Sequence, residues 1–244
     1  MDAEIQENHL KAYGVTFWVL ERNLKVKWLL NYRGGSFLLP NAEIIQRECQ
    51  IRGVSFEILS DSQTTQILDD ISSPSVNQEA VVLEKAPKIA VYTPYGKQPW
   101  DDAVTMVLTY AEIPYDTIYD EEVLKEELLL YDWLHLHHED FTGQFGKFYR
   151  SYRSAAWYIE EKKEAERLAK RLGYSKVSDA KLAVALKIRN YVAGGGFMFA
   201  MCSATDSFDI ALSAENIDIC EPMFSADNAI SDRKSTRLNS SHVR

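Results

Sequence analysis

The sequence predicts an α/β fold in which a parallel sheet is flanked by helices. Short β-rich runs at residues 89–92, 115–120 and 133–137 alternate with helical segments between positions 100 and 130. Parallel strands need long crossover connections, which are usually helices, so this alternation favours a parallel sheet with right-handed crossovers. A fourth apolar run, residues 197–201, follows two further helical segments and extends the same pattern.

The first 86 residues predict a smaller α/β segment. Its expected elements are a helix over residues 8–20, a strand over 25–30, a helix over 41–52, a strand over 54–59, and a short helix with a connector over 61–85. Residues 54–59 are assigned to a strand because their polar and apolar side chains alternate with period two. The boundary between the two halves is placed near Pro87.

The second half, residues 87–224, predicts the larger domain. Besides its four strands it contains helical patterns over residues 100–111, 121–130, 158–172, 178–192 and 204–214. Between the last two of these helices lie Gly194, Gly195 and Gly196, followed by the strand at 197–201. Glycines at such a position indicate a turn between a helix and the strand that follows it.

The composition excludes several classes of protein. The chain has 244 residues, 46% of them hydrophobic, and a formal net charge of -9, which argues against nucleic acid as a partner. It has no apolar run of the roughly 18 residues that a membrane span requires. The spacing of Cys49, Cys202 and Cys220 provides neither a disulfide framework nor a Cys-x-x-Cys metal pair.

Cys202 is the first candidate for chemistry, because it lies where the apolar run 197–201 meets a helix. In an open α/β sheet, ligands bind outside the carboxyl ends of the strands. A thiol at a helix N-terminus is also stabilised as the thiolate, the nucleophilic form. The alternative is that Cys202 is a small apolar residue buried in a core strand.

A polar cluster follows the strand at 133–137 and consists of His137, His138, Glu139 and Asp140. Alternate residues of a strand share one face, so His135, His137 and Glu139 are one set of candidate metal ligands. Two alternatives remain open: an ordinary polar strand end, or acid, base and substrate-binding groups facing Cys202. Because no other His or Cys is spaced to complete a metal site, neither a metal nor another cofactor is assigned.

Residues 192–204 resemble the segment of class I glutamine amidotransferases in which paired glycines precede a strand and a cysteine elbow. Residues 131–136 resemble the strand that leads to the oxyanion loop of that family. Two departures are the polar residues 137–140 in place of a glycine-rich loop, and the alanines that flank the elbow, Ala200 and Ala204, in place of glycines. The resemblance implies a flavodoxin-like arrangement of the sheet.

We assign roles to individual residues by assuming that the site lies around Cys202, at the carboxyl ends of the strands. The expected catalytic residues are Cys202, His137 and Glu139. The expected substrate-binding residues are His138, Asp140, Gly195, Gly196, Ser203 and Arg33. Arg33 is a candidate for anion binding because it lies beside two glycines. The alternative is that it is solvated or ion-paired, as arginines in loops more often are.

The strings at residues 31–37, 137–143 and 199–206 resemble a Bacteroidota protein family labelled asparagine synthetase B, over about residues 2–224. A glutamine-dependent asparagine synthetase carries a Ser-Gly-Gly-x-Asp-Ser loop whose glycines let the backbone approach ATP pyrophosphate. The nearest string here, residues 203–207, lacks those glycines. ATP-dependent asparagine synthesis is therefore not expected.

The same resemblance implies that the natural chain extends beyond both ends of this one and is exported to the periplasm. Amidotransferases take the histidine and glutamate partners of the cysteine from downstream, so this fragment is expected to be inactive. Residues 232–243 resemble one translated frame of a sequencing adapter, and residues 225–244 are expected to be a non-native or disordered tail.

Two functions are consistent with these patterns. The first is an amidotransferase-like or hydrolase-like enzyme with Cys202 as its nucleophile, and a small molecule, carbohydrate or peptide as its ligand. The alternative is a non-catalytic module of the same fold that binds a sugar, a peptide or a metal. The sequence leaves the substrate and the oligomeric state open.

Overall fold

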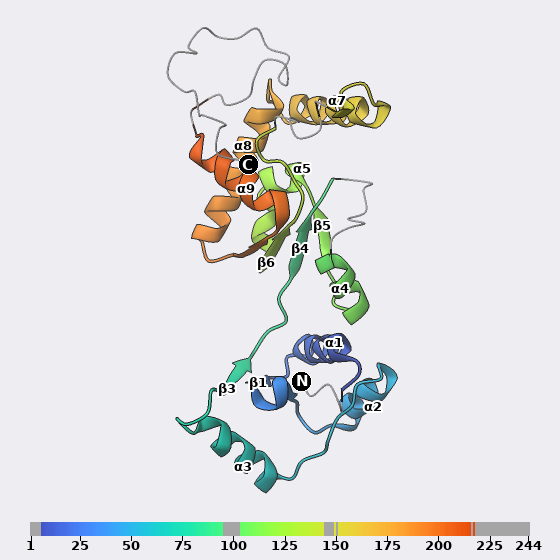
Figure 1. The fold of residues 1–244 in the computed structure, drawn as a ribbon, viewed down its shortest axis with the longest axis vertical. Helices are drawn as coiled ribbons and strands as arrows, with labels where there is room; N and C mark the ends of the chain where they lie inside the picture. The colour runs from blue at the N-terminus through green and yellow to red at the C-terminus, as the bar shows by residue number, and fades with distance from the viewer. Residues whose placement is uncertain (1–5, 95–102, 144–148, 150, 216, 218–244) are drawn as a thin grey trace. The chain divides into compact units, whose positions relative to one another are not determined.

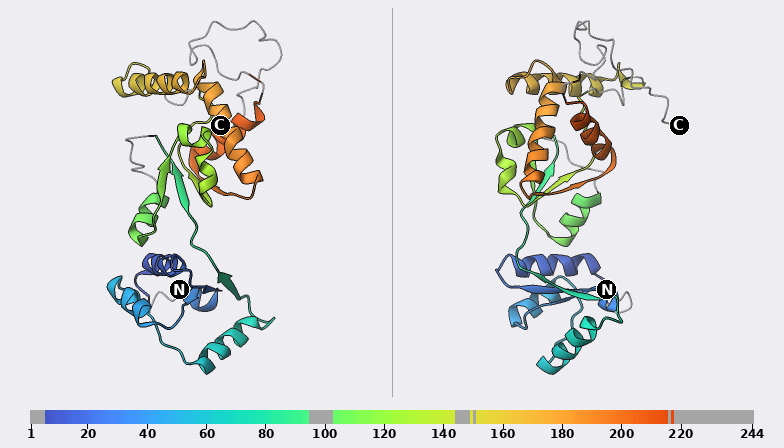
Figure 2. Two further views of the ribbon diagram at one scale, coloured as in Figure 1. Left: turned by 180° about the vertical axis from the view of Figure 1, so that it is seen from behind. Right: turned by 90° about the vertical axis from the view of Figure 1, so that its left-hand side faces the viewer.

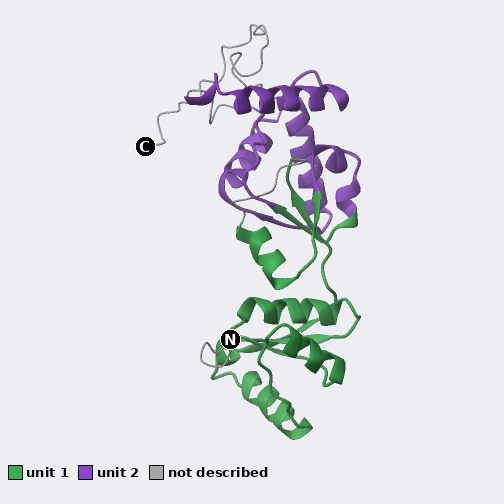
Figure 3. Ribbon diagram, turned by 90° about the vertical axis from the view of Figure 1, so that its right-hand side faces the viewer, with its two compact units in different colours: residues 1–117, 130–135 green, residues 118–129, 136–244 purple. Residues whose placement is uncertain are grey.

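The computed structural model describes residues 6–94, 103–143, 149, 151–215 and 217. The chain packs as two compact units, one of residues 1–117 and 130–135 (unit 1) and the other of residues 118–129 and 136–244 (unit 2) (Figure 3). The domain boundary near Pro87 stays a prediction. The expectation for the tail at 225–244 concerns residues outside the described ones.

Unit 1 contains a three-stranded antiparallel sheet in the order β2-β1-β3. Its strands are β1 (Val26–Leu30), β2 (Ser36–Leu38) and β3 (Glu79–Leu83). In the central strand, Trp28 lies opposite Phe37 on one side and Val81 on the other, and the Trp28 and Phe37 rings stack with centroids 6.0 Å apart. Cross-strand aromatic pairs of this kind stabilise a sheet and fix its register.

The strand predicted over residues 54–59 is wrong: these residues form no strand, and the sheet consists of β1, β2 and β3. The backbone of Ser55 is instead held by the side chain of Gln6, which donates to its carbonyl at 3.0 Å and accepts from its N–H at 3.3 Å. The connector predicted before Pro87 contains β3, and β2 also went unpredicted. The alternating pattern did not identify which segment joins the sheet.

The core of unit 1 lies between this sheet and two helices, α1 (His9–Leu20) and α2 (Glu43–Ile51). Val15 and Val19 of α1 pack with Val26 of β1 and Ile45 of α2, all of them buried. Figure 2 shows α1 alongside the strands. A third helix, α3 (Asp61–Ser72), begins at a capping box in which Ser60 and Gln63 bind each other's backbone N–H.

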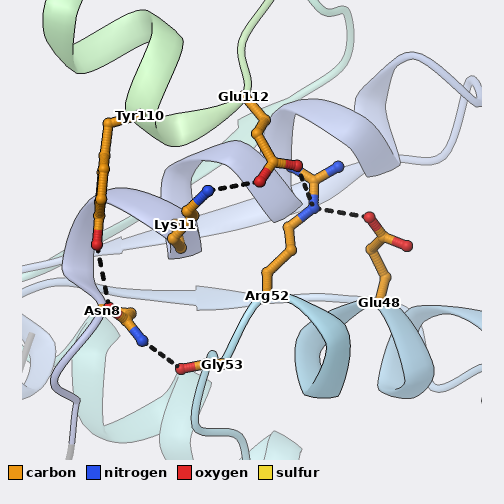
Figure 4. A network of polar contacts seen from close by, with 7 residues as sticks. All are labelled: Asn8, Lys11, Glu48, Arg52, Gly53, Tyr110 and Glu112. Carbon is orange, nitrogen blue, oxygen red and sulfur yellow. Dashed lines mark hydrogen bonds and ion pairs between the residues drawn. The ribbon is translucent and has the colours of Figure 1, made fainter.

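A polar network joins α1, the end of α2 and the turn after α4 (Ala103–Ala111) within unit 1 (Figure 4). The Arg52 side chain is 8% exposed and its Nε lies 2.7 Å from Glu48 and 3.5 Å from Glu112. Lys11 donates to the same Glu112 carboxylate. Because Arg52 is largely shielded from water, removal of either carboxylate would leave a poorly solvated guanidinium with fewer partners.

The second sheet has the order β5-β4-β6-β7, and Figure 1 labels the first three of these strands. Its strands are β4 (Ile89–Tyr92), β5 (Asp116–Ile118), β6 (Trp133–Leu136) and β7 (Phe197–Ala200). The central pair β4 and β6 is parallel, with Val91 opposite His135. The predicted parallel sheet flanked by helices is confirmed, and the order agrees with a flavodoxin-like arrangement.

This strand order positions the candidate site. From β4 the chain adds β5 on one side, and from β6 it adds β7 on the other. The strand order therefore reverses between β4 and β6, and in open α/β sheets ligands bind outside the carboxyl ends of the strands at such a reversal. The predicted polar cluster directly follows the carboxyl end of β6.

The helices of unit 2 include α5 (Asp120–Leu124), α7 (Ala156–Arg171), α8 (Val177–Ala193) and α9 (Cys202–Ser213). The central helix α8 packs against α5, α7 and α9 (Figure 1). Its buried face includes Val184, Ala185 and Ile188. The described residues also include two short 3-10 helices, η1 (Tyr32–Gly34) and η2 (Glu127–Leu130). Across the described part of the chain, no helix has both the length and the apolar character needed to cross a bilayer.

Candidate functional site

Cys202 lies on the turn between β7 and α9, as the sequence predicts. Met201 is extended and Cys202, the first residue of α9, has φ = 50°, in the left-handed region that only a small share of non-glycine residues adopt. Such a conformation costs about 1–3 kcal/mol and is concentrated at functional sites. The Cys202 side chain is exposed, which excludes the alternative of a cysteine buried in the core.

Two backbone hydrogen bonds join this turn to the end of β6. The N–H of Met201 donates to the carbonyl of Leu136 at 2.9 Å, and the N–H of Ala204 donates to the carbonyl of His137 at 3.0 Å. These two bonds therefore continue the pairing of β6 and β7 into the turn that carries Cys202.

Two serines of α9 extend the same connection. Ser203 Oγ donates to the carbonyl of His138 at 3.1 Å, and Ser207 Oγ donates to the carbonyl of Glu139 at 2.8 Å. Together with the backbone pair, they bind the carbonyls of four consecutive residues, 136–139. The segment that carries the two histidines is thus fixed against the first turn and a half of α9.

The side chains of His137, His138 and Cys202 converge. One nitrogen of each imidazole and the Cys202 sulfur all lie within 4.8 Å of one another. The two imidazole rings have centroids 3.7 Å apart and are tilted by 36°. His137 is buried, whereas His138 and Cys202 are exposed. The group therefore lies at the protein surface, with His137 on its inner side.

Glu139 is turned toward the backbone of its own segment. Its Oε2 accepts a hydrogen bond from the His137 N–H at 3.2 Å. Burial raises the pKa of the Glu139 carboxyl, while its hydrogen bonds to backbone N–H groups and the nearby Lys181 ammonium oppose the shift. The carboxylate therefore shapes the loop that carries His137.

A buried charge network lies beside this loop. The Lys181 ammonium is 2.8 Å from Asp120 Oδ1 and 3.1 Å from the Tyr119 hydroxyl, and the Lys181 and Asp120 side chains are 7% and 5% exposed. Burial alone would lower the pKa of Lys181, but Tyr119 and Asp120 raise it above its ordinary value. Burial also raises the pKa of Tyr119, with Glu139 among the smaller causes.

The sequence contained a signal for this network that our prediction missed. Lys181 lies four residues before Ala185 and seven before Ile188, so it shares the buried face of α8. A lysine on the apolar face of a helix is rarely buried without a partner. The acidic N-terminus of α5, with Asp120 as its first residue, is where that partner lies.

The other predicted residues lie in different places. Gly195, at φ = 102°, and Gly196, whose added Cβ would be 2.2 Å from the Tyr191 ring, form the turn before β7. They lie at the amino end of that strand, whereas Cys202 follows its carboxyl end. Their described role is therefore to shape the turn between α8 and β7.

The three remaining candidate residues, Arg33, Asp140 and His135, each have a local environment of their own. Arg33 belongs to unit 1, where its guanidinium is 3.3 Å from Glu57. Asp140 is exposed and accepts the N–H of Thr142 at 2.8 Å, which forms a local turn. His135 is fully buried within β6 and does not belong to the converging group, in which His138 takes the position expected for it.

Comparisons with protein-family models, with curated proteins and with solved structures find no match to this chain. The case for a function therefore depends on the geometry around Cys202.

Proposed function

We propose that this protein is a thiol-dependent hydrolase of carboxamides, similar in chemistry to the glutaminase half of an amidotransferase. The observation that carries the proposal is the exposed Cys202 at a left-handed elbow, with an imidazole nitrogen of His137 within 4.8 Å of its sulfur. A nucleophile on a strained turn between a strand and a helix is the arrangement by which α/β hydrolases expose their reactive atom.

In the proposed reaction, the His137 imidazole accepts the proton of the Cys202 thiol as the sulfur attacks the amide carbonyl carbon. The C–N bond then breaks, and the imidazolium returns that proton to the leaving amine or ammonia. Water, losing a proton to the same imidazole, cleaves the thioester and releases a carboxylic acid. The thiol regains its proton and the cycle closes.

His137 suits the role of base better than His138 does. Its backbone is fixed on both sides, by the N–H bond to Glu139 and by the carbonyl bond from Ala204, and its ring is buried. A base held in place loses little freedom in the transition state. The His138 imidazole is exposed at the same surface as Cys202, and the partial positive charge at the α9 N-terminus favours the developing oxyanion.

The test is turnover by this chain. The amidotransferase resemblance places the partners of the cysteine downstream and so implies an inactive fragment, whereas His137 as the base predicts activity. Ammonia release from L-glutamine and p-nitrophenolate release from p-nitrophenyl acetate are measured for the wild type, Cys202→Ser and His137→Ala, with Cys49→Ala as the thiol control. We expect Cys202→Ser to lower both rates by at least about 100-fold, and His137→Ala by about 10²–10⁴-fold. Wild-type rates in Cys202→Ser, or a wild type no faster than that variant, would overturn the proposal.

A further inference from the structure

The converging group of His137, His138 and Cys202 also has the composition of a transition-metal site. Its ligand atoms come from two segments, the end of β6 and the start of α9, which four hydrogen bonds hold together. Two imidazoles and a thiolate suit zinc and related borderline cations, whereas Mg²⁺ and Ca²⁺ prefer oxygen ligands. The chemistry of the three side chains therefore selects the class of cation.

The distances allow a tetrahedral ion after small side-chain movements. Zinc binds nitrogen at about 2.0–2.1 Å and sulfur at about 2.3 Å, so two nitrogens and one sulfur bound to it lie roughly 3.3–3.6 Å apart. The three atoms here lie within 4.8 Å of one another, which leaves at most about 1.5 Å to close. His138 and Cys202 are exposed at the surface, and the backbone of His137 is held by hydrogen bonds with Glu139 and Ala204.

The number of ligands determines what kind of site this is. Structural zinc sites are usually closed by four protein ligands, whereas three protein ligands leave a position for water or another molecule. The three described side chains therefore form an open site at the surface. A metal bound there exchanges with the solution more readily than one enclosed by four residues.

We propose that His137, His138 and Cys202 bind a divalent cation of the zinc class, and that the bound metal blocks Cys202 as a nucleophile. On binding, the Cys202 thiol releases its proton to solvent and its sulfur donates a lone pair to the metal. The same lone pair is the one that would attack a carbonyl carbon. The proposal that these residues bind a metal is independent of the proposed function. Only the proposal that the bound metal inhibits Cys202 rests on the proposed hydrolase function.

The metal-binding half is tested with Co²⁺, which gives a near-ultraviolet charge-transfer band when a thiolate binds it, and with Zn²⁺ in competition with a chromophoric chelator. We expect one ion per chain, loss of the band in Cys202→Ser, and at least about tenfold weaker Zn²⁺ binding in His138→Ala. Cys49→Ala is the control and should keep the band. An unchanged band in Cys202→Ser, or no binding at micromolar metal, would overturn the site.

The block of the Cys202 thiol can be measured in the wild type alone, so this second test does not depend on whether a variant folds. Zn²⁺ at one equivalent should slow the alkylation of wild-type Cys202 by iodoacetamide at least about tenfold, and chelation should restore the rate. Zn²⁺ binding without such protection would overturn the block of the thiol but leave the hydrolase proposal intact. If Zn²⁺ protects Cys202 from alkylation but the protein turns over neither substrate, the metal-site proposal would stand and the hydrolase proposal would be overturned.

Discussion

The N–H of Ala204 donates a hydrogen bond of 3.0 Å to the carbonyl of His137. This one contact joins the first turn of α9, which carries the exposed thiol, to the segment after β6, which carries the imidazoles. Because it links backbone to backbone, it fixes the separation of the two segments whatever side chains they carry. The proposed chemistry depends on this separation.

The first prediction concerns the reactivity of the thiols. Cys202 is exposed, whereas Cys49 is 2% exposed and its burial raises the pKa of its thiol. We expect brief treatment of the folded protein with iodoacetamide to label Cys202 first, as measured by peptide mass mapping. Labelling of Cys49 or Cys220 ahead of Cys202 would contradict this.

The second prediction concerns Ser207, whose hydroxyl donates to the Glu139 carbonyl from a nearly buried position. In Ser207→Ala that carbonyl loses its partner, so the free energy of unfolding should fall by about 1–3 kcal/mol in urea titrations. Thr205→Ala is the matched control on the exposed side of α9 and should stay within about 0.5 kcal/mol of the wild type. Equal effects of the two substitutions would show that the serine does not hold the loop.

The third prediction concerns the buried pair of Lys181 and Asp120. Lys181→Met leaves Asp120 as an uncompensated buried charge, so it should lower the free energy of unfolding by about 3–5 kcal/mol. Removing Asp120 as well, in Lys181→Met/Asp120→Leu, should recover a large part of that loss. Urea titration of the three proteins measures both effects.

The exposed pair of Lys187 and Glu126 provides the control on the same helix. Lys187→Met should cost no more than about 1 kcal/mol, since exposed ion pairs contribute little. If Lys181→Met is no more destabilising than Lys187→Met, the buried network does not support the loop.

The fourth prediction concerns pH. Burial is the largest cause of the raised pKa of Glu139 in the folded protein, so protonation of this carboxyl favours folding. Its contribution to stability is fully present below the unfolded pKa of about 4.3 and is lost as the pH rises through the folded pKa. The wild type should therefore gain stability relative to Glu139→Gln as the pH falls from neutral toward that range. A difference that is constant with pH, or that changes in the opposite direction, would contradict this.

The sequence predicted the sheet of the second half well because its signals are local and strong. The strands at 89–92, 133–136 and 197–200 are short apolar runs bounded by turns, and Cys202 follows the last of them. Each of these features can be recognised within a few residues. The elbow was therefore predicted before any long-range contact was known.

The features that were missed depend on long-range pairing. Residues 54–59 alternate as a strand does, yet β1 pairs with residues 36–38 and 79–83 instead. His135 and His137 share a face only while the chain is a regular strand, and β6 ends at Leu136. Beyond that residue the hydrogen bonds from α9 decide the direction of the chain, and they bring His138 to Cys202.

The most direct test of the central claim is to locate the acyl group. The wild type is mixed with p-nitrophenyl acetate, quenched in acid within the first turnover, digested and mapped by mass spectrometry. The account predicts an acetyl thioester on the peptide that carries Cys202, slower to form in His137→Ala and absent in Cys202→Ser. An acetyl group on another residue, or equal acetylation of the Cys202 peptide with and without the His137 imidazole, would contradict it.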